Sequence, residues 1–156
     1  MSKINLFSLS LLFGVFAQAT PKMLYRCQAV HPTKSITIDI KIYKDGSKYT
    51  ATAIESSFSG SIDLLSANPQ GWGMPSMELV EVNAEAKVNV LTLSKGHFSL
   101  EINTQKSRLE MRDVISDSGF GGDAILKKAQ IKITPANLTA RDKGGIISTD
   151  VECSAN

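Results

Sequence analysis

The chain has 156 residues, of which 42% are hydrophobic and 21% are charged, and its formal net charge is +2 at pH 7. The charged side chains are spread without blocks, so there is no clustered basic face of the kind that binds nucleic acid. No linker, internal repeat or low-complexity tract divides the sequence. We therefore expect one folded domain that does not bind nucleic acid.

The first nineteen residues predict a secretory signal peptide. Lys3 supplies a positive charge, residues 4–16 are almost wholly apolar, and Ala17-Gln18-Ala19 has the small-x-small form of a cleavage site. The apolar stretch is shorter than the roughly 20 residues that cross a bilayer, and no later stretch is long enough. We expect a single β-domain at 20–156 that is periplasmic or secreted and has no membrane span.

Cys27 and Cys153 lie near the two ends of the predicted domain and are the only cysteines in the chain. In an oxidising compartment such a pair is expected to form a disulfide. Strand alternation places Cys27 on the side of Tyr25, and Cys153 on the side of Val151, so both sulfurs face the apolar side. Because a disulfide needs Cα atoms within about 7 Å, the first and last strands are expected to be neighbours or to face one another across the core.

A hairpin is predicted in the first third of the chain. Isoleucines alternate with polar residues over 36–42, which is typical of a half-buried strand, and Asp45-Gly46 suits a two-residue loop. With that loop Ile40 pairs with Ala51, and the apolar side chains of both strands share one face.

A second hairpin is predicted around Lys95-Gly96, where a two-residue loop pairs Leu93 with Phe98. Val88 and Val90 fall on the opposite face of the same run. Either that strand is covered on both sides or a bulge shifts its phase.

The remaining strands complete an all-β pattern. They are expected near 24–30, 58–66, 76–82, 108–115, 125–134 and 146–153, although 78–87 also suits a short helix. About nine or ten short strands predict an antiparallel meander that forms a barrel, with a two-layered β-sandwich as the alternative. In a closed meander the first and last strands are neighbours, so the barrel agrees better with the cysteine pair.

Two glycine-rich loops carry the predicted contact residues. Trp72 and Met74 lie in a segment with glycine and proline at 68–75, and Phe120 lies among glycines at 117–123. Trp72 either plugs one end of the core or serves as an exposed anchor, since tryptophan is enriched among residues that dominate interface energy. With four strands between them, both loops are expected on one rim of an up-and-down array. We therefore predict Trp72, Met74 and Phe120 as ligand-binding or partner-binding residues.

Catalytic, cofactor and metal sites are not expected. His31 and His97 stand at predicted turns, and the sequence lacks the ligand spacing of a structural zinc site. Asp117 and Asp123 flank a glycine loop and are weak candidates for calcium ligands, but their spacing matches no EF-hand loop. We predict no cofactor and no enzyme.

Together these features predict an exported non-catalytic binding protein that contacts a protein or a small apolar ligand through loops at one rim of a β-barrel. The alternatives are an envelope-associated structural domain or an inhibitor of a secreted hydrolase. An enzyme with an unrecognised carboxylate site is the weakest alternative.

Overall fold

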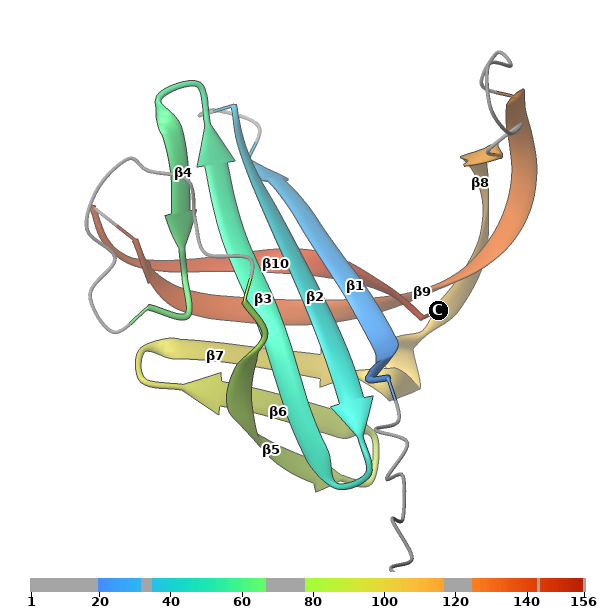
Figure 1. Cartoon of the computed structure of the whole chain (residues 1–156). Coiled ribbons are helices and arrows are strands. Elements are labelled where there is room, and N and C mark those ends of the chain that lie inside the picture. Colours follow the sequence, from blue (N-terminus) through green and yellow to red (C-terminus); the bar gives the residue numbers. More distant parts are fainter. Residues whose placement is uncertain (1–19, 32–34, 67–77, 117–124, 143, 156) are drawn as a thin grey trace, which may run out of the picture.

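A computed structural model describes residues 20–31, 35–66, 78–116, 125–142 and 144–155 (Figure 1). Its elements, in chain order, are β1 Lys22–His31, β2 Ile36–Asp45, β3 Lys48–Ser57, β4 Gly60–Asp63, β5 Val80–Lys87, β6 Val90–Lys95, β7 Phe98–Asn103, the 3-10 helix η1 Thr104–Lys106, β8 Arg108–Ser116, β9 Ile125–Asp142 and β10 Gly145–Ala155. In these segments no helix has the length and apolar character needed to cross a bilayer.

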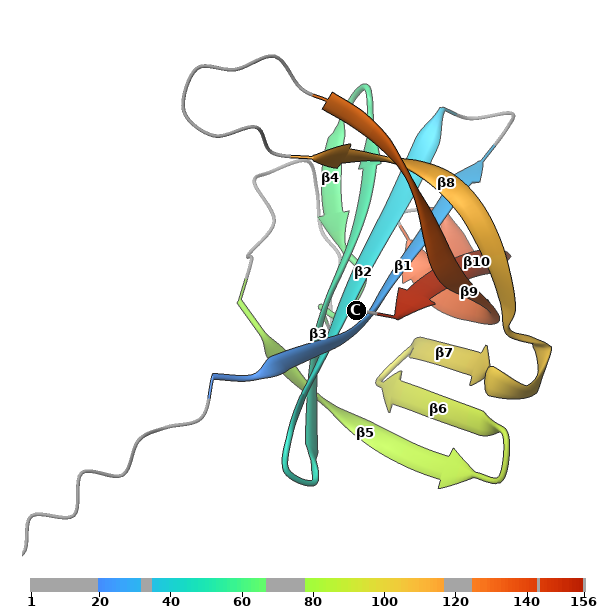
Figure 2. The same cartoon turned by 90° about the vertical axis from the view of Figure 1, so that its right-hand side faces the viewer.

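Eight strands form a closed antiparallel barrel (Figure 2). Their order is β10-β1-β2-β3-β5-β6-β7-β9, and the pairing of β9 with β10 closes the ring. β4 adds to β3, and β8 pairs with β9 outside the ring. The predicted antiparallel barrel is therefore confirmed, and the sandwich alternative is not.

The Cys27–Cys153 disulfide joins the first strand to the last, as predicted. The two residues oppose one another in the β1–β10 register, with an S–S distance of 2.03 Å and a Cα–Cα distance of 3.8 Å. Both are completely buried. The bond closes a sequence separation of 126 residues and lies on the core side of the wall.

Apolar side chains fill the barrel interior. They come from alternate positions along the strands, as a pleated wall with one covered face requires. The largest fully buried members of this core are Phe98, Ile40, Ile42, Leu93, Leu100, Ile102 and Leu138. The barrel is thus a packed scaffold.

The first predicted hairpin forms, but its turn lies one residue later than expected. The turn residues are Gly46 and Ser47, so Ile40 pairs with Ala53 instead of Ala51. Gly46 has a φ of +57° at the first central position, which a type II′ hairpin turn requires. Because the register shift is two residues, the same side chains still face the core.

The second hairpin differs from its prediction in the same way. Its turn residues are Gly96 and His97, so Leu93 pairs with Leu100 instead of Phe98. The φ of Gly96 is +56°, again at the first central position. Both predicted loops were therefore wrong by one residue for the same reason.

The chain reverses at Val88, which explains the conflict of phase predicted there. Lys87 at the end of β5 pairs with Val90 at the start of β6, and Val88 and Asn89 form the turn between them. Val88 is 90% exposed. A third hairpin thus replaces the bulge considered for the strand before Lys95-Gly96, and β5 replaces the helix considered for 78–87.

β9 continues well beyond its predicted end at residue 134 and reaches Asp142. Pro135 does not end it because this residue lies where β9 changes neighbours. The last pair with β8 is at Ile133, and the first pair with β7 is at Ala136. Proline has no N–H to donate. Because Pro135 lies between the last pair with β8 and the first pair with β7, the missing donor interrupts neither of these two ladders.

The first half of β9 leaves the barrel together with β8. We call β8 and residues 125–133 of β9 the arm; it projects from the barrel as a two-stranded ribbon (Figure 1). Its nine residue pairs run from Arg108↔Ile133 to Ser116↔Ile125 without a register shift. No other described strand pairs with β8.

Candidate functional site

Strand alternation gives the arm two faces. Directly opposed residues of an antiparallel pair point to the same side of a ribbon. The outer face carries Leu109, Met111, Asp113, Ile115, Leu126, Lys128, Gln130 and Lys132, and the inner face carries Arg108, Glu110, Arg112, Val114, Lys127, Ala129, Ile131 and Ile133.

The outer face exposes large apolar side chains. Leu109 is 62% exposed, Met111 63%, Leu126 67% and Ile115 73%. Single exposed apolar residues are ordinary on a protein surface. Four on one face of a narrow ribbon form a patch, and such patches mark interaction surfaces.

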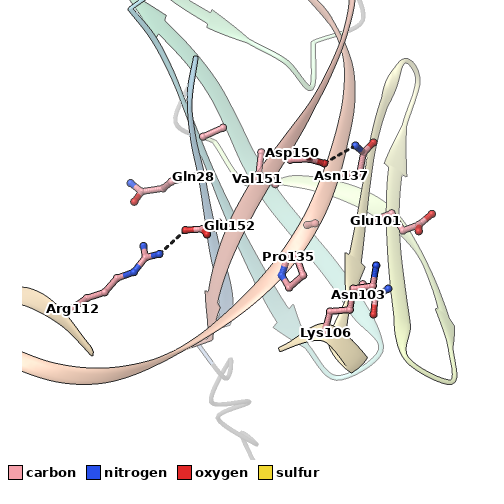
Figure 3. A pocket seen from close by; sticks show the side chains of 12 residues that line it. Gln28, Glu101, Asn103, Lys106, Arg112, Pro135, Asn137, Asp150, Val151 and Glu152 are labelled. Carbon is pink, nitrogen blue, oxygen red and sulfur yellow. Dashed lines mark hydrogen bonds and ion pairs between the residues drawn. The ribbon is translucent and has the colours of Figure 1, made fainter. Parts of the chain in front are cut away.

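The inner face is joined to the barrel by an ion network. Arg108 donates to Glu110 Oε1 at 2.6 Å and to Glu152 Oε1 at 2.7 Å. Arg112 donates to Glu110 Oε2 at 2.8 Å and to Glu152 Oε2 at 2.5 Å. Glu152 belongs to β10, so the two arginines connect the arm to the barrel wall. Figure 3 shows the contact between Arg112 and Glu152.

The network shifts the protonation equilibria of its members. Hydrogen bonds from Arg112 and then Arg108 lower the pKa of Glu110. The pKa of Glu152 is also lowered, chiefly by the hydrogen bond from Arg112 and against a smaller desolvation effect. The pKa of Arg108 is raised mainly by Glu110, and that of Arg112 mainly by Glu152. All four groups are therefore held in their charged forms.

A polar groove of about 730 Å³ lies over the outer wall of the barrel beside this network (Figure 3). Its polar side chains are those of Gln28, Glu101, Asn103, Lys106, Arg112, Asn137, Asp150 and Glu152. Asn137 Nδ2 donates to Asp150 Oδ1 at 3.2 Å. The volume lies in the range of small-molecule sites, which are usually lined mostly by apolar and aromatic groups. Eight of the twelve lining residues carry polar or charged side chains and none is aromatic, so the groove suits a polar ligand better than an apolar one.

A smaller cavity of about 120 Å³ is lined by residues of β1, β2, β3, β9 and β10. Its lining combines Ala29, Ile36, Ile38 and Ile147 with the polar residues Glu55, Asp142, Ser148 and Thr149. Glu55 is only 6% exposed. Binding pockets for drug-sized ligands measure roughly 300–1,000 Å³, so this cavity is too small for such a ligand.

The predicted contact residues Trp72, Met74 and Phe120 lie outside the described residues, as do Asp117 and Asp123. Their roles stay predictions. Ser116 and Ile125, which flank 117–124, pair at the tip of the arm, away from the barrel (Figure 1).

The described histidine side chain, that of His97, is exposed in the turn between β6 and β7. His31 ends β1, and its side chain is not described. In the part of the chain that the structure describes, no three His, Cys, Asp or Glu residues group closely enough to hold a metal ion.

A scan against protein-family models, a search of curated proteins and a search of solved structures each found no match for this chain.

Proposed function

We propose that this chain is an exported, non-catalytic binding protein that recognises another protein through the outer face of its arm. The observation that carries the proposal is the apolar outer face, where four large side chains are 62–73% exposed. A two-stranded ribbon has no core of its own and is marginally stable in water. A partner that covers this face would bury those side chains and stabilise the ribbon.

The disulfide and the predicted signal peptide both support an oxidising compartment. A buried Cys27–Cys153 bond is typical of proteins that fold in an oxidising space. Together with the leader predicted at 1–19, it supports a periplasmic or secreted location.

A small apolar ligand inside the barrel is less well supported. The interior is occupied by residues such as Phe98, Leu100 and Ile102, all 1% exposed or less. The cavity that reaches the interior near Glu55 measures about 120 Å³. We assign the barrel the role of a rigid support for the arm.

Inhibition of a secreted hydrolase is a second candidate, which the shape of the arm favours. A ribbon that projects from a closed barrel can enter a cleft that a barrel cannot (Figure 1). In that case the residues near the tip, beside the Ser116↔Ile125 pair, would contact the enzyme.

The test is affinity capture from extracytoplasmic extracts of the source organism, with three forms of the mature protein. Met111→Asp places a charge in the middle of the outer face, and Val88→Asp places the same charge on an exposed barrel turn. We expect a partner that binds the wild type and Val88→Asp but not Met111→Asp. If every captured protein tolerates Met111→Asp, the outer face is not the recognition surface.

A further inference from the structure

We infer that the partner contributes an extended segment that pairs with the free edge of β8 as an additional strand. This inference rests on the proposed function and specifies how the arm binds. All nine residues of β8 pair with β9 on one side, and no described strand pairs with β8 on the other. An unpaired edge presents a row of backbone N–H and C=O groups, which is the template used in β-strand addition.

The two edges of the arm differ in how strongly they oppose pairing. The β9 side carries Lys127, Lys128 and Lys132, and lysine on an exposed edge is a common protection against strand addition. β8 contains no lysine, proline or glycine, and its ladder has no bulge. The β8 edge is therefore the receptive one.

The two arginines of β8 do not protect its edge as lysines would. Arg108 and Arg112 point to the inner face, where Glu110 and Glu152 hold both guanidinium groups. The ion network neutralises their charges. The backbone of β8 therefore stays accessible along the edge that faces away from β9.

The outer side chains of β8 specify the chemistry of the incoming segment. Leu109, Met111 and Ile115 form an apolar row that Asp113 interrupts. Opposed side chains in an antiparallel pair lie about 4.5–5.5 Å apart at Cβ. The matching segment therefore has apolar residues opposite the three apolar positions and a lysine or arginine opposite Asp113.

A second copy of this chain fits the same edge poorly. Antiparallel self-pairing centred on Arg112 sets two guanidinium groups opposite each other. Pairing centred on Met111 sets Asp113 opposite Leu109. Like charges, and a carboxylate set opposite an apolar side chain, both oppose such ladders.

A lipid surface also fits less well than a strand. The lysines Lys128 and Lys132 beside the apolar outer face are compatible with anionic headgroups. However, apolar lipid would leave the backbone groups of the β8 edge without hydrogen-bond partners. An added strand satisfies those groups and covers the apolar row at the same time.

The probe for the test is a synthetic peptide of nine residues, the length of β8. It has valine opposite Leu109, Met111 and Ile115, lysine opposite Asp113, and threonine elsewhere. Two derivatives carry N-methyl groups on alternate amides, one set in each derivative. Because only one set of amides faces β8 in a ladder, we expect one derivative to lose binding and the other to keep it.

Variants of the protein complete the design. Met111→Lys adds an edge lysine, and we expect it to weaken peptide binding by about tenfold or more, a change of about 1.4 kcal/mol. Val88→Lys, at an exposed barrel turn, is expected to bind the peptide like the wild type. Thermal denaturation checks that both variants keep the barrel fold.

Several results would overturn strand addition. Equal binding of both N-methylated peptides would indicate simple apolar adhesion. Dimerisation of the protein that Met111→Lys abolishes would assign the edge to a second copy, and sedimentation with phosphatidylglycerol vesicles without peptide binding would assign the face to a membrane. A partner that needs Met111 but does not compete with the peptide would leave the proposed function intact and remove strand addition alone.

Discussion

The barrel and the arm use the same alternating strand pattern, yet only the barrel covers its apolar side chains. Leu100 and Leu138 lie on opposed strands of the barrel wall and are fully buried. Leu109 alternates with charged neighbours in the same manner and is 62% exposed. Alternation thus decides which side chains share a face, whereas a second layer of structure decides whether that face is buried.

The two regions also differ in their backbone edges. Closure of the barrel through β9 and β10 removes its principal edges. The arm keeps an edge on each side and is joined to the barrel by the ladder at its base and by the Arg108/Arg112–Glu110/Glu152 network. We therefore expect the barrel to unfold as a unit and the arm to open locally at lower free energy.

Loss of the disulfide is expected to give the largest fall in the free energy of unfolding. This loss concerns the barrel and not the arm. For a closed loop of this length the chain-entropy model predicts that the disulfide stabilises the folded state by about 5 kcal/mol, and measured values are often smaller. The double variant Cys27→Ala/Cys153→Ala is expected to lower the urea midpoint strongly, and the reduced wild-type protein serves as the control. An unchanged midpoint would show that the barrel closes without the bond.

A matched pair of leucine variants contrasts the two regions directly. Leu100→Ala is expected to lower the free energy of unfolding by about 2–5 kcal/mol, because it removes buried methyl groups and leaves a cavity. Leu109→Ala is expected to change it by less than about 0.5 kcal/mol, since its side chain is largely solvated. Urea denaturation measures both; similar losses in the two variants would mean that the arm has a buried core.

A smaller loss is expected at the base of the arm, where Thr134 is buried. Its Oγ1 lies 2.9 Å from Ser107 Oγ, which also donates to the Thr104 carbonyl at 2.9 Å. Thr134→Val removes one hydrogen bond and leaves Ser107 with its other partner, so a loss of about 1 kcal/mol is expected. Thr92→Val, on the partly exposed side of β6, is the control, and an equal effect there would contradict the role of the Thr134 hydroxyl.

Breaking the ion network is expected to affect the order of the arm more than the stability of the barrel. The pKa values of Glu110 and Glu152 are lowered, so their contribution is complete above the ordinary carboxyl range and is lost as pH falls through the lowered values. At pH 7, Glu152→Gln is expected to lower the NMR order parameters of the β8 amides. Wild type at strongly acidic pH should approach the same values.

The control for the network is Glu101→Gln, in the groove but outside the ion network. It should leave the order of β8 unchanged at pH 7. Equal disorder in both variants would show that the arm responds to groove charge in general and not to its attachment through Glu152.

The candidate site could be predicted only in part from the sequence. The run near 108–115 predicts a strand, and β8 at Arg108–Ser116 confirms it. Nothing in that run distinguishes a strand of the barrel from one outside it.

The sequence by itself determined the features that depend on local chemistry. Periodicity of two identified the strands and the inward position of Cys27 and Cys153, and their pairing required the first and last strands to meet. Tertiary structure alone decided the two-residue register shifts, the passage of β9 past Pro135 and the departure of the arm from the wall. Those outcomes depend on which strand lies beside which, and that choice is made by contacts between residues far apart in the chain.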